Sequence, residues 1–271
     1  MRADVLIHQQ GHTESREKAR ALIMAGKVMI NGQYIQKPGT DVQVTAQIAI
    51  EEKAIPFVSR GGVELEKAIT AFGLALTGVV AADIGASTGG FTDCMLQRGA
   101  TRVYAVDVGY GQLDWRLRND ERVIVMERTN ARNMQPDHFA SPLDFASIDV
   151  SFISLKLILP ALRTCLRENA QVVALIKPQF EAGRADVGKN GVVRDAAVHQ
   201  KVCDTVLKNA TVCGFDCIDL SFSPITGPKG NVEFLTLLQK SKAAPGEFRF
   251  DPATKISAIV ASAHETLRSI D

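Results

Sequence analysis

Short apolar runs alternate with longer stretches of helical periodicity through most of the chain. Each run has the length of one buried strand, and the stretches between them are long enough for covering helices. The pattern predicts an α/β fold with a mostly parallel sheet between layers of helices. The runs lie at residues 79–83, 102–107, 122–126, 144–149 and 171–176.

Two apolar stretches near the end of the chain predict an antiparallel hairpin that closes this sheet. FDCIDLSFSPI (215–225) and NVEFLTLLQ (231–239) flank ITGPKG, in which Gly and Pro favour a reversal of chain direction. The last segment, 253–270, has the pattern of a helix and carries no residues that suggest chemistry.

The first part of the chain has a different pattern. HTESREKARALIMAGKV (12–28) predicts a helix with a Thr/Ser cap and a stop at Gly26. VMINGQYI (28–35) predicts a hairpin whose Asn-Gly pair suits a type I′ turn, and QVTAQIAIE (43–51) predicts a further strand. AIPFVSRGG (54–62) then reads as a connector.

We therefore expect four segments along the chain. They are a small α+β module (1–54), a linker (55–62), a larger α/β domain (63–240) and a C-terminal tail with a helix (241–271).

Composition is that of an ordinary globular protein and excludes several classes. The chain has 271 residues, 46% hydrophobic and 23% charged, with a formal net charge of +1, so overall charge indicates no polyanionic partner. No run approaches the roughly 18 apolar residues of a membrane span, and MRADVLIHQQ lacks the apolar core of a signal peptide. The five cysteines form no CxxC pair. We predict a cytoplasmic protein without a metal site or membrane contact.

Basic residues gather at the start of the predicted N-terminal helix. Arg16, Lys18 and Arg20 lie close together there, beside a predicted small sheet. Such an arrangement can hold the backbone of a nucleic acid. The same charges fit a solvated helix face equally well.

A glycine-rich turn follows the first predicted strand of the larger domain. In VVAADIGASTGGFTD (79–93), Gly85, Ser87 and Gly89 lead into a helix, which lets a ligand approach the backbone at the helix N-terminus. The next strand ends in Asp107, 22 residues after Gly85, where a carboxylate can accept both hydroxyls of a ribose. The turn predicts a nucleoside-containing ligand.

Three ligand classes are candidates for this turn. A nicotinamide dehydrogenase needs glycine at the position of Ser87, so that a pyrophosphate can touch the backbone. GASTG also matches the GxSxG elbow of hydrolases, but His138, His199 and His264 do not lie in loops with other site-like residues. S-adenosylmethionine has a ribose and no phosphate, so it tolerates Ser87, and Asp83 can meet its amino-acid part. We favour S-adenosylmethionine.

Charged residues also mark three other strand ends. Asp149 and Lys177 end parallel strands and would face one crevice, which Glu233 joins only if the hairpin lies next to the strand that ends in Lys177. A neutral lysine can take the proton of a ribose 2′-hydroxyl, although an ordinary lysine titrates at about 10.4. Burial would lower the pKa of Lys177, and the two carboxylates would raise it.

Several motifs in order resemble a known family. SREKARALIMAGKVMING is similar to a small RNA-binding module shared by a ribosomal small-subunit protein and many pseudouridine synthases. FVSRGG, DIGASTGGFTD, VYAVDVGYGQL, ERTNAR, DVSFISL, LIKPQFE and GNVEFL resemble the TlyA (hemolysin A) family. That family joins the module to a Rossmann-like, FtsJ-like methyltransferase domain.

The resemblance implies S-adenosylmethionine-dependent 2′-O-methylation of cytidine in 16S or 23S ribosomal RNA, with that RNA or ribosomal subunits as partner. It also implies a Lys-Asp-Lys-Glu tetrad, of which Asp149, Lys177 and Glu233 are present, with Lys177 as the base. Asn130 in ERTNAR would lie near the adenine. The expected cofactor-binding residues are Asp83, Gly85, Ser87, Gly89, Asp107, Asn130 and Asp149.

One position departs from the family pattern. SRGGVELEKA places Glu64 where the first tetrad lysine belongs, and Lys67, one helical turn later, is the candidate to replace it. We predict that positioning of the RNA phosphate or substrate ribose is weakened, and that Glu64→Lys changes the methylation rate.

The loop EAGRADVGKNGVVRD (181–195) follows the predicted base and carries cations among glycines. We expect an RNA-contacting lid, with a plain solvated loop as the alternative. The expected RNA contacts are Arg16, Lys18, Arg20, Arg60, Arg184, Lys189 and Arg194.

Two other functions stay open on the sequence alone. Glu64 suggests an RNA-binding protein with impaired or absent methyl transfer. The second name of the family suggests a hemolysin-like, membrane-active protein, against which stand the missing membrane span and signal peptide.

Overall fold

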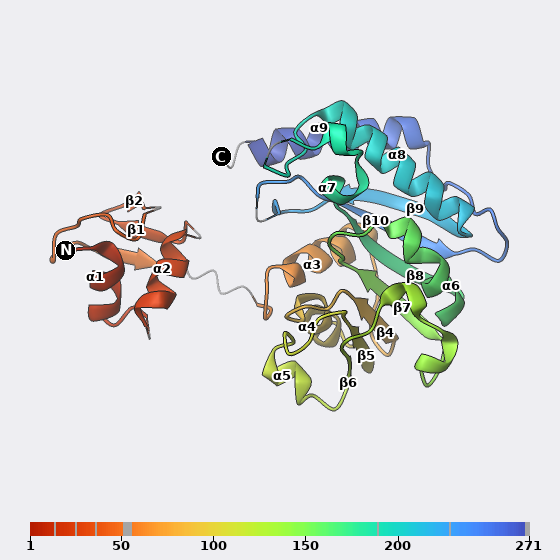
Figure 1. Cartoon of the computed structure of the whole chain (residues 1–271), viewed down its shortest axis with the longest axis horizontal. Helices are drawn as coiled ribbons and strands as arrows, with labels where there is room; N and C mark the ends of the chain where they lie inside the picture. Colours follow the sequence, from red (N-terminus) through yellow and green to blue (C-terminus); the bar gives the residue numbers. More distant parts are fainter. Residues whose placement is uncertain are drawn as a thin grey trace. The chain divides into compact units, whose positions relative to one another are not determined.

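The protein folds into two compact units, Met1–Ile55 and Pro56–Asp271, each with its own hydrophobic core (Figure 1). The computed structural model describes residues 1–13, 15–24, 26–35, 37–50, 56–188, 190–227 and 229–268.

The N-terminal unit is a small α+β module. Its sheet is antiparallel with strand order β2-β1-β3, and apolar side chains of the helices and the sheet form one core. The elements are α1 (Ala3–Gln9), α2 (Arg16–Met24), β1 (Val28–Ile30), β2 (Gln33–Tyr34) and β3 (Ile48–Ile50).

Two local features of this unit bear on the sequence prediction. The predicted hairpin turn is confirmed, because Asn31 and Gly32 both have positive φ, 51° and 79°, as a type I′ turn requires. Helix α1 is absent from the prediction. Its buried residues Ala3, Leu6 and Ile7 follow a helical spacing, but a helix this short gives too few positions to establish a period.

The second unit is built on one sheet with strand order β6-β5-β4-β7-β8-β10-β9. Strands β4 to β8 are parallel, and β10 is antiparallel to both of its neighbours, so the predicted parallel sheet with a closing hairpin is confirmed. The strands are β4 (Val80–Ile84), β5 (Arg102–Val106), β6 (Val123–Met126), β7 (Leu143–Ile148), β8 (Leu166–Ile176), β9 (Phe215–Phe222) and β10 (Phe234–Lys240).

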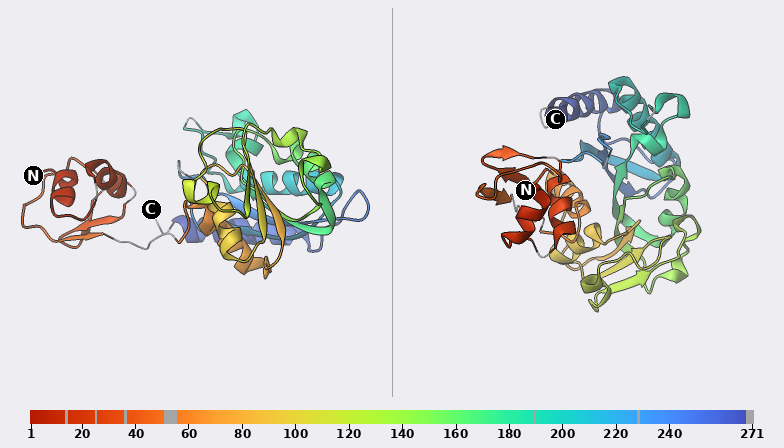
Figure 2. Two further views of the ribbon diagram at one scale, coloured as in Figure 1. Left: turned by 90° about the horizontal axis from the view of Figure 1, so that it is seen from below. Right: turned by 60° about the vertical axis from the view of Figure 1, so that its left-hand side comes forward.

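Helices cover both faces of this sheet (Figure 1; Figure 2). Alternate strand residues enter opposite cores: Ala81 packs with α3 and α4, whereas Ala82 packs with α6, α8 and α9. The α-helices are α3 (Gly61–Phe72), α4 (Gly90–Gln97), α5 (Trp115–Arg118), α6 (Leu159–Cys165), α7 (Pro178–Glu181), α8 (Ala196–Val212) and α9 (Pro252–Arg268). Short 3-10 helices lie at η1 (Ala131–Asn133), η2 (Pro136–His138), η3 (Leu155–Leu157) and η4 (Arg184–Asp186).

The C-terminal helix α9 is part of the packed unit. Ile256, Val260, Ala263 and Leu267 are buried at helical spacing and belong to the same core as α8 and β9. Among the described helices, none combines the length and the apolar character needed to cross a bilayer.

The order of the strands locates a ligand crevice. β4 lies between β5 on one side and β7 on the other, so the chain reverses its direction of travel along the sheet at this point. In open α/β sheets, ligands bind outside the carboxyl ends of the strands at such a reversal.

Candidate active site

The glycine turn after β4 packs tightly against the end of β7. Gly85 has a φ of 88°, and a Cβ at this position would lie 2.2 Å from the carbonyl oxygen of Asp149. The amides of Gly85 and Ala86 both donate to the carbonyl of Val106 at the end of β5, at 2.8 and 3.1 Å. The turn is therefore held against the ends of β5 and β7, and only glycine fits at residue 85.

A cavity of about 530 Å³ lies over the ends of β4, β5, β6 and β7. This is within the usual range for a small-molecule site. Asp107 lines it and accepts hydrogen bonds from the amides of Ser87 at 2.8 Å and Gly109 at 2.6 Å, which fix the direction of its carboxylate. Asn130 and the apolar Ile153 also line this cavity. A carboxylate, an amide and an apolar wall suit the ribose and the purine of a nucleoside.

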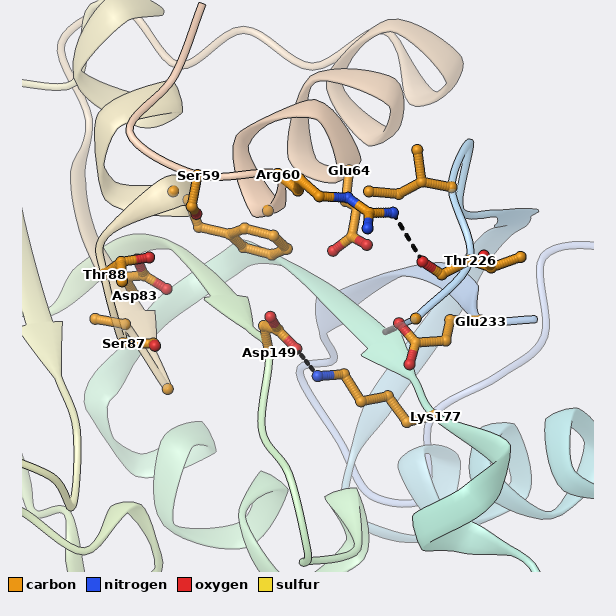
Figure 3. Close-up of a pocket in the computed structure, with 17 residues that line it drawn as sticks. Ser59, Arg60, Glu64, Asp83, Ser87, Thr88, Asp149, Lys177, Thr226 and Glu233 are labelled. Carbon is orange, nitrogen blue, oxygen red and sulfur yellow. Dashed lines mark hydrogen bonds and ion pairs between the residues drawn. The ribbon is translucent and has the colours of Figure 1, made fainter. Parts of the chain in front are cut away.

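A second cavity, of about 210 Å³, adjoins the first. Both are lined by Gly85, Ser87 and Asp149, so these residues separate a nucleoside-sized space from a smaller one. Lys177 and Glu233 line only the smaller cavity and point toward Asp149 (Figure 3). The structure thus brings together the three strand-end residues that the sequence singles out.

Lys177 is held by one carboxylate and lies in the field of two others. Its ammonium group forms an ion pair with Asp149 and lies 3.5 Å from the hydroxyl of Ser151. Burial lowers the pKa of Lys177, but Asp149, Glu233 and Glu64 raise it more, so the pKa lies above its ordinary value. The amine is therefore charged in this arrangement.

The position of Glu233 depends on how the hairpin folds onto the sheet. Phe234, the first residue of β10, pairs with Ile176, the last residue of β8, so Glu233 and Lys177 lie beside each other. Gln179 donates to the Glu233 carboxylate at 2.8 Å and holds it at the cavity wall. The hairpin thus lies next to the strand that ends in Lys177, so Glu233 shares the crevice with Asp149 and Lys177.

Glu64, where the family resemblance leads us to expect lysine, lies on α3 and lines the smaller cavity. Its carboxyl group is buried, and this burial, followed by the charges of Asp149 and Glu233, raises the pKa of Glu64 to about 8. Lys67 does not take the place of the missing cation. Its ammonium lies over the ring of Phe222, 5.9 Å from the centroid, and it does not line the cavity.

Asp83 and Gly89 shape the turn from inside the protein. The buried carboxylate of Asp83 accepts the amide and the hydroxyl of Thr92, at 2.8 and 2.7 Å, which ties β4 to α4. Burial raises the pKa of Asp83 to about 7 despite these bonds. Gly89 has a φ of 95°, and a Cβ there would lie 2.3 Å from Leu117, so this glycine serves the close approach of a core side chain.

The candidate RNA contacts differ in their surroundings. Arg16 pairs with the buried Asp4 at 2.9 Å and so also serves the core of the N-terminal unit, whereas Lys18 and Arg20 have exposed side chains. Arg60 donates to the carbonyl of Thr226 at 2.9 Å. Lys189 lies outside the described residues, and the remaining candidates, Arg184 and Arg194, are exposed.

The geometry does not support a hydrolase triad. The hydroxyl of Ser87 lies 3.4 Å from Gln112. His199 is bonded to His264 at 2.8 Å and to the carbonyl of Val193 at 3.1 Å. These imidazoles are therefore engaged with each other on the α8–α9 side of the sheet.

Several residues that build the site were not predicted from the sequence. Gln179, Ser151 and Ser223 orient Glu233, Lys177 and Glu64 respectively. Gln179 and Ser151 each stand two residues beyond a predicted charged residue, which is the one signal that would have indicated them.

Together, these features define a class of protein. A nucleoside-sized cavity at the reversal point of an α/β sheet, beside a lysine paired with a carboxylate, fits a methyltransferase that uses S-adenosylmethionine. Residues 57–240 match the profile of the FtsJ-like methyltransferase family, and residues 1–48 match the S4 domain. The chain belongs to the FtsJ-like methyltransferase family, in its TlyA (hemolysin A) branch, with S-adenosylmethionine as methyl donor and RNA as substrate.

Relatives cover nearly the whole chain. YqxC of Bacillus subtilis is 49% identical over 271 residues, which cover 98% of this chain and 95% of its own. The 16S/23S rRNA (cytidine-2′-O)-methyltransferase TlyA of Mycobacterium tuberculosis is 44% identical over 239 residues, or 88% of this chain and 89% of its own. A solved structure from Streptococcus thermophilus, which carries a hemolysin name, has 48% identity and a TM-score of 0.81, and covers 100% of this chain and 98% of its own.

Proposed function

We propose that this protein methylates the 2′-hydroxyl of a cytidine ribose in 16S or 23S ribosomal RNA, in the cytoplasm. The observation that carries the proposal is the position of the Lys177 amine, against Asp149, where the two cavities meet. Two relatives support the choice of substrate. TlyA of Mycobacterium tuberculosis is named a 16S/23S rRNA cytidine-2′-O-methyltransferase, and TlyA of Campylobacter jejuni, 29% identical, is named a 23S enzyme.

The two cavities divide the work of binding. Asp107 and Asn130 would hold the nucleoside part of the cofactor, and Gly85 and Ser87, which line both cavities, would face its amino-acid part. S-adenosylmethionine, when bound, supplies an electrophilic methyl group and a positive sulfonium charge. The smaller cavity would then receive the acceptor ribose beside Asp149 and Lys177.

Methyl transfer to a ribose hydroxyl requires a base beside the acceptor oxygen. The ribose 2′-oxygen forms a bond to the methyl carbon as the carbon–sulfur bond breaks, and the hydroxyl proton passes to the neutral amine of Lys177. Asp149 orients that amine through its ion pair, but Asp149 and Glu233 also raise its pKa, which keeps most of it charged. A positive charge near Lys177 lowers the pKa again, so cofactor binding would favour the reactive form.

An exposed aromatic ring at the edge of the larger cavity suits a nucleic-acid acceptor. Phe152 is 90% exposed, has a positive φ of 64°, and lies 4.8 Å from the ring of Phe180. Single-stranded bases stack on such rings. We expect Phe152 to contact a base of the RNA close to the acceptor ribose.

Replacing Phe152 by alanine is expected to raise the KM for RNA about tenfold, which corresponds to a stacking free energy of about 1.4 kcal/mol. Steady-state methylation at varied RNA concentration measures it. Trp115→Ala is the matched control, because Trp115 is 71% exposed but lines neither cavity. Equal effects of the two substitutions would contradict the assignment.

The function itself is tested by incubating the protein with methyl-labelled S-adenosylmethionine and ribosomal subunits that lack the modification. A 2′-O-methyl group protects the neighbouring phosphodiester from alkali, so the label is expected in an alkali-resistant dinucleotide. Label in mononucleotides would indicate methylation of a base instead. A protein that binds cofactor and RNA but leaves both subunits unlabelled would support the impaired, RNA-binding alternative.

A further inference from the structure

Among the residues that the structure describes, no cation forms an ion pair with the buried carboxyl group of Glu64. Glu64 lies in the first turn of α3, is 6% exposed, and shares the smaller cavity with Asp149, Lys177 and Glu233 (Figure 3). The nearby cations are engaged elsewhere: Lys177 pairs with Asp149, and Arg60 donates to a backbone carbonyl at 2.9 Å. A buried carboxyl group in this position is more stable as the neutral acid.

Hydrogen bonding at Glu64 also favours the neutral acid. Its carboxyl oxygen lies 3.4 Å from the hydroxyl oxygen of Ser223. That hydroxyl has a single proton, and it is 2.6 Å from the carbonyl oxygen of Ile225, to which it donates. The contact between Ser223 and Glu64 is therefore attractive when the carboxyl group of Glu64 supplies the hydrogen.

Charged groups face Glu64 from several elements. Lys67, although on the same helix, lies over Phe222, and no charged residue of α4 or β9 lines the cavity among the residues that the structure describes. The groups that share the cavity are Arg60 before α3, Asp83 from β4, Asp149 after β7, Lys177 after β8 and Glu233 before β10. Carboxyl groups dominate this set, so ionisation of Glu64 adds negative charge beside the Lys177 amine.

We propose that Glu64 is a positioning residue that holds a proton in the resting site and, once ionised, keeps Lys177 in its charged form, so that it sets the pH range of methyl transfer. The inference rests on the function proposed above. Burial and the neighbouring carboxylates bring the pKa of Glu64 to about 8, and ionised Glu64 raises the pKa of Lys177. As the pH rises through the pKa of Glu64, this residue becomes negatively charged. The neutral fraction of Lys177 then grows less than it would beside an uncharged residue.

The sign of the effect determines the test. Glu64→Gln imitates the protonated acid at every pH, so the ratio of its rate to the wild-type rate is expected to rise about tenfold between about pH 6.5 and about pH 9.5, as for a change of one unit in the pKa of the base. Glu64→Lys puts a cation beside Lys177 and is expected to exceed the wild-type rate by about tenfold or more already at about pH 7.

A matched control lies on the same helix. Glu66 is bonded to Arg98 at 2.8 Å and does not line the cavity, so Glu66→Gln removes a carboxylate without touching the site. Its rate relative to the wild type is expected to be independent of pH. Melting temperatures of all variants establish that they are folded.

A direct titration separates this inference from the proposed function. NMR of isotope-labelled glutamate carboxyl carbons, with Glu64→Gln to identify the signal, is expected to show Glu64 titrating near pH 8. Titration at the ordinary value for glutamate, or a ratio of Glu64→Gln to wild-type rates that does not change with pH, would overturn the inference and leave the methyltransferase function standing. Titration near pH 8 in a protein that methylates no RNA would overturn the function instead.

Discussion

Replacing Lys177 by alanine is expected to slow methyl transfer to RNA about 10³-fold, because general-base catalysis typically contributes 10²- to 10⁴-fold. Lys177 lines only the smaller cavity, so the affinity for S-adenosylmethionine is expected to change by no more than about threefold, or about 0.7 kcal/mol. Single-turnover rates and cofactor binding by calorimetry measure the two quantities. A large loss of rate without a loss of cofactor is the signature of the base.

Lys67→Ala is the matched control for this prediction. Lys67 lies one helical turn after Glu64 on α3, and its ammonium lies over Phe222 rather than in the cavity. Its removal is expected to leave the rate within about twofold of the wild type, or about 0.4 kcal/mol. If Lys67→Ala lost as much as Lys177→Ala, the lysine in the cavity would not be the base.

Replacing Gly85 by alanine is expected to destabilise the methyltransferase unit by about 3 kcal/mol and to abolish cofactor binding. The φ of 88° is strained for any residue with a side chain, and the added Cβ would lie 2.2 Å from the backbone oxygen of Asp149. Relief of that clash requires β4 and β7 to move apart at the point where the two cavities meet. Denaturant unfolding and cofactor titration measure both effects.

Gly73→Ala is the control that separates backbone strain from the steric clash expected in Gly85→Ala. Gly73 has a φ of 63° at the end of α3, and a Cβ there would meet no atom within 4 Å. This substitution is expected to cost about 1 kcal/mol, from backbone strain alone, and to leave cofactor binding intact. Similar losses in the two variants would mean that the close approach at Gly85 has no special role.

The sheet could be predicted from the sequence because its strands are buried on both faces and read as continuous apolar runs. The positions of Asp149 and Lys177 followed, since the carboxyl ends of parallel strands share one edge. The position of Glu233 could not be predicted from the sequence alone. It depends on β10 rather than β9 pairing with β8, and the apolar pattern of the two hairpin strands does not distinguish these pairings.

The directions in which side chains point could not be predicted from the sequence. Helical spacing left Lys67 as a candidate for the cavity, but its stem extends toward β9, whereas Glu64 faces inward. Asp83 was expected beside the amino-acid part of the cofactor. It lines the smaller cavity, yet its carboxylate is bonded to Thr92 within the protein, because the first turn of α4 presents an amide and a hydroxyl to it.

The central claim is most directly tested in cells that lack this protein. Their ribosomal RNA, digested to nucleosides and analysed by mass spectrometry, is expected to gain 2′-O-methylcytidine when the wild-type chain is restored and not when Lys177→Ala is restored at equal abundance. If neither chain restored the modified nucleoside, or if both did, the account of Lys177 as the base of a ribosomal RNA ribose methyltransferase would be contradicted.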